Sequence, residues 1–137
     1  MLRAVSCAFV LALSLSAAGC DNGPEPTTPT PPPTVTDTFS GNLNLNGAAT
    51  HSFTTAAAGT ITATLTGINP AENNILGFSM GTWDGVTCRI VLANDFAVAS
   101  STLTGTTASP ASLCIRVYDQ GNLKNDSVDY SVQVVHP

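Results

Sequence analysis

The sequence predicts an all-β fold, an antiparallel, jelly-roll-like β-sandwich of about eight short strands that occupies residues 38–137. Three observations predict it. From Thr38 onward, apolar and polar residues alternate with a period of two, which is typical of strands with one buried face. Turn-forming residues recur about every 8–12 positions, as they do in sandwiches and barrels. No window of about 12 residues in this region carries an apolar stripe at helical spacing.

The predicted strands, in chain order, are 38–46, 49–55, 59–67, 75–83, 86–94, 100–106, 112–119 and 127–135. The first, second and sixth carry the weaker alternation. The third alternates Ile61 and Leu65 with threonines, which gives one apolar face and one hydroxyl face. In the last strand, Val128 and Tyr130 begin a row of apolar residues on one face. The segment 69–74 is the one place in this region where a helical turn could form.

The fourth and fifth segments form the clearest predicted hairpin. Between them lies Asp84-Gly85, a pair favoured in two-residue type I′ turns because glycine accepts positive φ without steric cost. The expected apolar face of the fifth segment comprises Val86, Cys88, Ile90 and Leu92.

Cys88 and Cys114 are predicted to form a disulfide. After export they would meet an oxidising compartment, where a disulfide is the default state of two cysteines. Cys114 is out of phase with the apolar residues of its own strand, so the bridge requires a bulge, a strand-end position or the opposite assignment of faces. A metal pair is the alternative, but His51 and His136 are single histidines without further ligands at metal-binding spacing. We expect neither a metal nor a cofactor.

Residues 1–19 have the three parts of a bacterial secretory signal. Arg3 supplies the positive charge, and the apolar run after it spans about 15 residues, fewer than the roughly 20 of a membrane-spanning helix. The run ends in "SAAGC", which resembles the lipobox of bacterial lipoproteins with Ala17 in place of the usual leucine. The resemblance implies cleavage after Gly19, a diacylglyceryl thioether on Cys20 and acylation of the new amino terminus. The alternative is an ordinary signal peptide, with Cys20 an incidental thiol.

Residues 20–37 would join this anchor to the sandwich. They hold six prolines and no apolar periodicity, which predicts a semi-rigid spacer; a docking ligand for an aromatic groove is the alternative. We therefore expect a protein of the bacterial cell envelope, lipid-anchored to the inner or outer membrane, with its domain in the periplasm or at the cell surface. Asp21 resembles the residue that retains some lipoproteins in the inner membrane, but this rule varies between bacterial groups, so the destination membrane stays open.

Composition and charge exclude one class of function. Charged residues make up only 9% of the chain, against about 25% in typical soluble domains, and the net charge is −5. The four basic residues, which are scattered, are Arg3, Arg89, Arg116 and Lys124. Because nucleic-acid binding needs a basic stripe, we expect no nucleic-acid partner. The expected partners are the membrane, through the lipid, and a protein or a polysaccharide.

The string "FSGNLNLNGAATHSFTTAAAGTITATLTG" resembles the start of the bacterial pre-peptidase C-terminal domain, and "SLCIRVYDQGNLKNDSVDYSVQVVHP" resembles its end. The residues that carry the resemblance are Gly41, Leu43, Phe53, Gly59, Leu65, Arg116, Val117, Gly121, Tyr130 and Val134. The resemblance covers residues 38–137 and implies a non-catalytic accessory β-sandwich. Some relatives bind calcium, but the acidic "D-x-D" pattern that usually opens their central strand is replaced here by "NNILGF" (73–78), so no calcium site is carried over.

Catalysis is not expected. His51 lies in a weakly patterned strand, and His136 is the penultimate residue and is expected to fray. Neither stands beside a recognisable nucleophile, as a catalytic triad would require. The aspartates lie in or beside predicted turns, where backbone capping accounts for them. The loop 119–126 has acids and amides, but not at the spacing of an EF-hand.

A binding role is the remaining hypothesis. Trp83, beside the predicted turn, and Tyr118, at a strand end, could form an aromatic platform for a sugar ring. The alternative is that Trp83 covers the end of the core. We therefore expect an anchored envelope protein with a non-catalytic interaction sandwich, and a carbohydrate- or peptidoglycan-binding module as the alternative.

Overall fold

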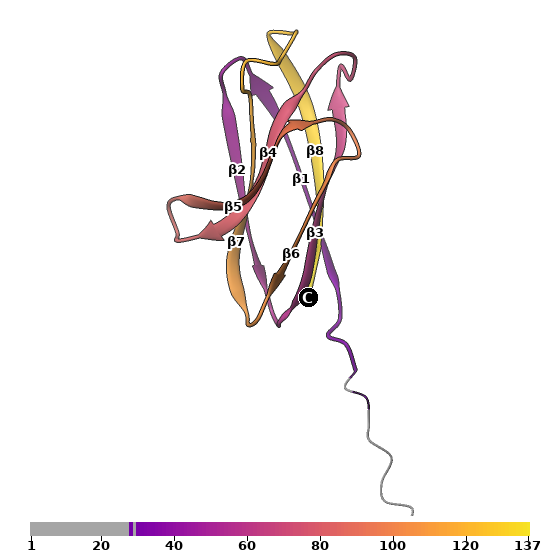
Figure 1. The fold of residues 1–137 in the computed structure, drawn as a ribbon, viewed down its shortest axis with the longest axis vertical. Coiled ribbons are helices and arrows are strands. Elements are labelled where there is room, and N and C mark those ends of the chain that lie inside the picture. Colours follow the sequence, from indigo (N-terminus) through magenta and orange to yellow (C-terminus); the bar gives the residue numbers. More distant parts are fainter. Residues whose placement is uncertain (1–27, 29) are drawn as a thin grey trace, which may run out of the picture. The chain divides into compact units, whose positions relative to one another are not determined.

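The computed structural model describes residue 28 and residues 30–137, within which eight strands form two four-stranded antiparallel sheets (Figure 1). The strands are β1 (Val35–Asn44), β2 (Ala48–Thr55), β3 (Gly59–Asn69), β4 (Leu76–Trp83), β5 (Cys88–Ala97), β6 (Thr102–Thr107), β7 (Ala111–Tyr118) and β8 (Ser127–His136). One sheet has the order β1-β8-β3-β6 and the other the order β2-β7-β4-β5. The prediction of an all-β sandwich is confirmed, and each predicted strand corresponds to an observed one. The predicted signal segment 1–19 and Cys20 lie outside the described residues.

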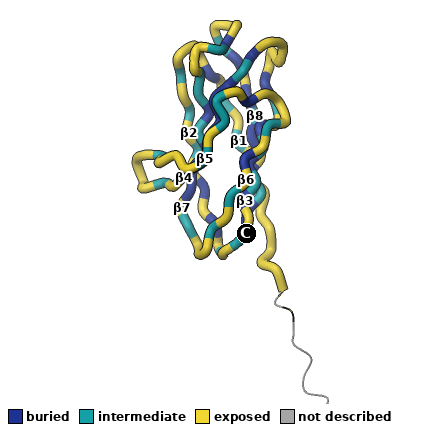
Figure 2. The backbone as a smooth tube through the Cα atoms, viewed as in Figure 1, coloured by how far each residue is buried: buried dark blue, intermediate teal, exposed yellow. Residues whose placement is uncertain are grey.

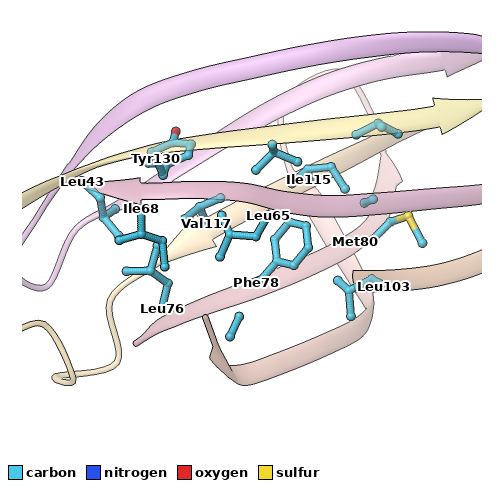
Figure 3. Packing of buried hydrophobic residues seen from close by; sticks show 14 of the residues in the cluster. Leu43, Leu65, Ile68, Leu76, Phe78, Met80, Leu103, Ile115, Val117 and Tyr130 are labelled. Carbon is cyan, nitrogen blue, oxygen red and sulfur yellow. The ribbon is translucent and has the colours of Figure 1, made fainter. Parts of the chain in front are cut away.

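The core lies between the two sheets and follows from the alternation in the sequence. Along β8, Val128, Tyr130 and Val132 are buried, while the residues between them reach the surface. Figure 3 shows side chains from both sheets, among them Leu65 of β3 and Phe78 of β4, pointing into the same apolar space. Burying one side chain of this size contributes about 1.5–3 kcal/mol, so these facing rows hold the sheets together.

β1 and β8 pair along their whole length, with Val35 opposite His136. The first strand therefore begins at Val35 rather than at Thr38, because β8 runs far enough to pair with these earlier residues. The expectation that His136 frays is wrong. Its side chain is buried, its Nε2 lies 3.1 Å from Oδ2 of Asp37, and its ring centroid lies 5.2 Å from that of Phe53.

β4 and β5 form the predicted hairpin, but the predicted two-residue turn is wrong. The strands are separated by the four residues Asp84–Thr87, of which only Gly85 has a positive φ, whereas a type I′ turn needs two such residues. The carboxylate of Asp84 closes this loop instead. It accepts hydrogen bonds from the backbone N–H groups of Val86 (3.0 Å) and Thr87 (2.7 Å).

The segment 69–74 forms a turn, and residues 30–137 contain no helix. The turn is held by the buried side chain of Asn74. Its Nδ2 donates to the carbonyl of Pro70 and to Oδ1 of Asn125, both at 2.8 Å, and its Oδ1 accepts the N–H of Lys124 at 2.9 Å. The turn is thus bonded to the loop that precedes β8. Among the described residues, no helix is long and apolar enough to cross a bilayer.

The predicted Cys88–Cys114 disulfide is confirmed, with the two Cα atoms 5.8 Å apart. Because β4 lies between β5 and β7 in the sheet, β5 must leave the plane of the sheet to make this bridge. It does so at Gly81, where a Cβ atom would collide with the backbone of Arg89. An irregularity in the β4–β5 ladder between Met80 and Gly81 accompanies the bend. The start of β5 therefore lies over the outer face of β4, and Cys114 is fully buried beneath it.

The disulfide thus lies on the outer face of its sheet, which explains why Cys114 is out of phase with the core residues of β7. The predicted apolar face of the 86–94 strand is wrong. Val86 is 85% exposed and Ile90 44% exposed, and of that set only Leu92 packs against the core. The bend at Gly81 and the extra residue in β5 end the simple alternation, and Figure 2 shows the tip of the hairpin projecting fully exposed.

Candidate functional site

An apolar cleft of about 410 Å³ opens between β5 and β6, which are the end strands of their two sheets. The buried side chains of Ile61, Met80 and Leu113 line it, and Val91 stands at its exposed edge. The remaining lining residues are Gly81, Thr82, Leu92, Thr104, Gly105, Thr106, Thr107 and Ala111. None of the lining residues is titratable. The lining of the cleft is therefore suited to binding apolar groups.

Two glycines shape this cleft. The bend of β5 at Gly81 draws the start of that strand toward the outer face of its sheet. On the opposite wall, Gly105 of β6 carries no side chain. A Cβ atom there would lie 3.0 Å from Cε of Met80 and 3.4 Å from Cδ1 of Leu92, so these two side chains occupy the space beside it. A larger residue at position 105 would narrow the cleft.

Apolar side chains continue from the cleft onto the surface of β5. Val91 is 70% exposed and Phe96 is 71% exposed. Sequence reasoning missed this site, because it assigned the apolar residues of the strand to the core. The sequence signal for this site is the run from Ile90 to Asn94, which carries no charged residue. Edge strands usually carry charged residues, so such a run is unusual in β5, which ends its sheet.

The structure places the two predicted platform residues, Trp83 and Tyr118, on the outer face of the β2-β7-β4-β5 sheet. Trp83 lines a second hollow, also of about 410 Å³, together with Thr50 and Arg116. The guanidinium carbon of Arg116 lies 5.4 Å from the centroid of the Tyr118 ring. Arg116 is therefore adjacent to both aromatic residues, which do not form one continuous stacking surface.

Tyr118 is fixed by its own contacts. Its ring covers Gly77, where a Cβ atom would overlap the ring, and its hydroxyl donates to Oδ1 of Asp95 at 2.5 Å. Burial, and then the hydrogen bond to Asp95, raise the pKa of Tyr118. No comparable hydrogen bond holds the side chain of Trp83 among the described residues. The aromatic platform stays a prediction.

Both histidines lie on the β1–β2 side of the sandwich, His51 within β2 and His136 at the end of β8, where it contacts Asp37 of β1 and Phe53 of β2. Nε2 of His51 lies 2.8 Å from the hydroxyl of Tyr130, and the His51 ring stacks on Phe39 at 5.0 Å. Burial lowers the pKa of His51. Within residues 30–137, neither His51 nor His136 hydrogen-bonds a serine, threonine or cysteine side chain.

The carboxylate of Asp119 organises the loop 119–126. Its Oδ1 accepts the backbone N–H groups of Gly121 (2.8 Å), Asn122 (3.0 Å) and Leu123 (3.2 Å), and its Oδ2 accepts that of Asn46 (2.8 Å). Burial raises the pKa of Asp119, but these four donors together outweigh that effect and hold the pKa below its ordinary value. The described part of the chain holds no group of three or more His, Cys, Asp or Glu residues placed to bind a metal ion.

Fold and site together define a two-sheet β-sandwich with an uncharged apolar cleft between its end strands. No family model matches the chain, and no curated protein matches it. The resemblance to the pre-peptidase C-terminal domain, and the accessory role that it implies, therefore stay predictions.

Proposed function

We propose that the protein is a lipid-anchored component of the bacterial cell envelope whose β-sandwich is a non-catalytic interaction module. The observation that carries the proposal is Cys20, which follows the small residues that end an export-type apolar run and directly precedes the proline-rich segment. Several acyl chains on one cysteine make a lasting anchor, whereas one chain makes a marginal one. A spacer is what an anchored domain needs to reach a partner.

Two features of the sandwich support this proposal. Paired cysteines are expected outside the reducing cytosol, so the Cys88–Cys114 bridge is consistent with export. The cleft between β5 and β6 is apolar and has no titratable side chain, which favours binding over catalysis.

Mass spectrometry of the mature amino terminus tests the anchor. We expect an acylated Cys20 at the first position, and we expect Cys20→Ser to move the protein from the membrane fraction to the soluble fraction. The variant Cys20→Ser leaves Cys88 and Cys114 in place, so folding of the sandwich is its internal control. A mature chain whose Cys20 is unmodified would contradict the proposal.

The second candidate function is carbohydrate or peptidoglycan binding, and the hollow beside Trp83 favours it. An indole ring next to the donors of Arg116 and Thr50 offers both a stacking surface and hydrogen bonds to a sugar. Retention of the protein on peptidoglycan or other polysaccharide, lost in Trp83→Ala, is the expected result. If the wild-type protein is not retained, this candidate is removed.

A further inference from the structure

We propose that the hollow beside Trp83 binds a sugar that carries one carboxylate, and that Arg116 recognises the negative charge. The residues that line this hollow are Ala48, Thr50, Trp83, Val86, Thr87, Cys88 and Arg116. The inference rests on the second candidate function given above and narrows it from carbohydrates in general to acidic sugars. It does not depend on the lipid anchor.

The first observation is that Arg116 is a cation without an acidic partner. The ion pairs that the described residues form are Arg89–Asp84 and His136–Asp37. The guanidinium of Arg116 instead contacts the ring of Tyr118, and the hydroxyl of that ring donates to Asp95. Arg116 is half-buried, and such a charge is screened by salt less than a fully exposed one. Its N–H donors are therefore available to an anion in the hollow.

The second observation is that the hollow also offers the surfaces that a sugar ring needs. The indole of Trp83 and the exposed side chain of Val86 supply an apolar wall for the C–H face of the ring. Thr50, which is exposed, lies directly opposite Arg116 in the β2–β7 pairing, and the exposed Thr87 lies on the hairpin side. Within the described part of the chain, neither threonine hydroxyl takes part in a hydrogen bond, so both can bond to sugar hydroxyls.

The third observation is that the walls of the hollow are joined covalently. Cys88 lines the hollow on the hairpin side, and its disulfide partner Cys114 precedes Arg116 by two residues on the same face of β7. The bridge therefore fixes the hairpin wall to the strand that carries Arg116. A site held in place before binding loses less conformational entropy when the ligand enters.

The charge balance favours a ligand with one negative charge. A guanidinium can bind one carboxylate through two parallel N–H···O bonds. The other arginine of this sheet, Arg89, is already paired with Asp84, and the chain as a whole has a net charge of −5. A polyanion would need several cations and would be repelled by the acidic remainder of the surface. A terminal uronic acid and a muramic acid share the chemistry that fits, which is one carboxylate on a pyranose ring.

Titration of the detergent-solubilised full-length chain, followed by the fluorescence of Trp83, tests the proposal. Trp83 is the single tryptophan, so its signal reports directly on ligand in the hollow. The probes form two matched pairs, methyl glucuronide with methyl glucoside, and N-acetylmuramic acid with N-acetylglucosamine. We expect an acidic sugar to bind about tenfold more tightly than its neutral counterpart, with a smaller advantage at high salt. The pair with the larger preference distinguishes an exported polysaccharide from peptidoglycan as the source.

Variants of the two arginines assign the preference to a residue. Arg116→Gln should remove the preference for the acidic sugar and leave the affinity for the neutral one unchanged. Arg116→Lys keeps the charge but not the planar fork, so it should retain part of the preference. Arg89→Gln removes the other arginine of the sheet, which does not line the hollow, and should bind as the wild type does. An unchanged urea midpoint should show that each variant folds.

Two results would overturn the inference and leave carbohydrate binding intact. One is equal affinity of the wild type for the acidic and the neutral member of both pairs. The other is a preference for the acidic sugar that persists in folded Arg116→Gln. If none of the four sugars gives a fluorescence change or a heat of binding, both the inference and the second candidate function are refuted. The acylation of Cys20 is tested separately and is not affected by any of these outcomes.

Discussion

Replacing both Cys88 and Cys114 by alanine should destabilise the sandwich by about 3.5 kcal/mol. The bridge closes a loop of sequence separation 26, and the chain-entropy relation for a loop of this length gives about 3.5 kcal/mol at 25 °C. The native state should change little, because β4 continues to pair with β5 on one side and with β7 on the other. A typical domain has about 5–15 kcal/mol of stability, so the loss is a large share of the total.

Urea unfolding of the oxidised protein and of the double variant measures this loss. Trp83 is the single tryptophan and ends β4 directly before the hairpin loop, opposite Cys88. Its fluorescence therefore reports on the region around the disulfide, whereas circular dichroism reports on all strands. We expect coincident transitions by both signals and a midpoint shifted to lower urea. The melting temperature should fall by about 10–20 °C.

Cys20→Ser is the matched control, since it removes a thiol from outside the sandwich and should leave the free energy of unfolding unchanged. A loss below about 1 kcal/mol for the double variant would refute the reasoning, because it would mean that the bridge constrains neither the unfolded loop nor the hairpin.

Three further predictions concern single side chains. Gly77→Val should cost about 1–3 kcal/mol of unfolding free energy, because its side chain would overlap the Tyr118 ring; an unchanged urea midpoint would contradict this. Asp119→Ala should cost about 1–3 kcal/mol at pH 7, since four backbone N–H groups lose their acceptor. The pKa of Asp119 is lowered from 3.8, so this contribution is present above pH 3.8 and is lost as the pH falls below it; a difference between wild type and variant that persists at pH 2 would contradict this. The pKa of His51 is lowered from 6.5, so the unfolded state takes up a proton first and the free energy of unfolding should fall as the pH drops below 6.5. The decrease in unfolding free energy between pH 7.5 and pH 5 should therefore be smaller in His51→Phe than in the wild type.

The sequence was sufficient to predict the eight strands because alternation reports directly which face of each strand is buried. Leu65 between threonines and Val132 between polar residues are buried as the pattern requires. The same rule failed in the 86–94 strand. There Val86 and Ile90 alternate like core residues, but β5 bends over the outer face of the sheet, and only the paired neighbours reveal that bend.

The candidate site was less accessible to sequence reasoning. A cleft between β5 and β6 depends on which strands end their sheets, and strand order is set by contacts between residues far apart in the chain. The position of His136 depends on the same kind of information, because it is covered by β1, about a hundred residues earlier. Trp83 and Tyr118 lie on the outer face of their sheet, and their relation through Arg116 could only be seen in the fold.

The pairing of β1 with β8 has a mechanical consequence. The chain enters the sheet at Val35, the first residue of β1, and β1 is an edge strand whose one neighbour in the sheet is β8. A force applied to the segment before Val35 therefore acts first on the Val35–His136 pair. A pull along the strand loads all the backbone hydrogen bonds of this ladder at once, whereas a pull across it loads them one after another. The sandwich should therefore resist stretching along its strands far better than peeling sideways, so the direction of a load would decide whether the domain survives it.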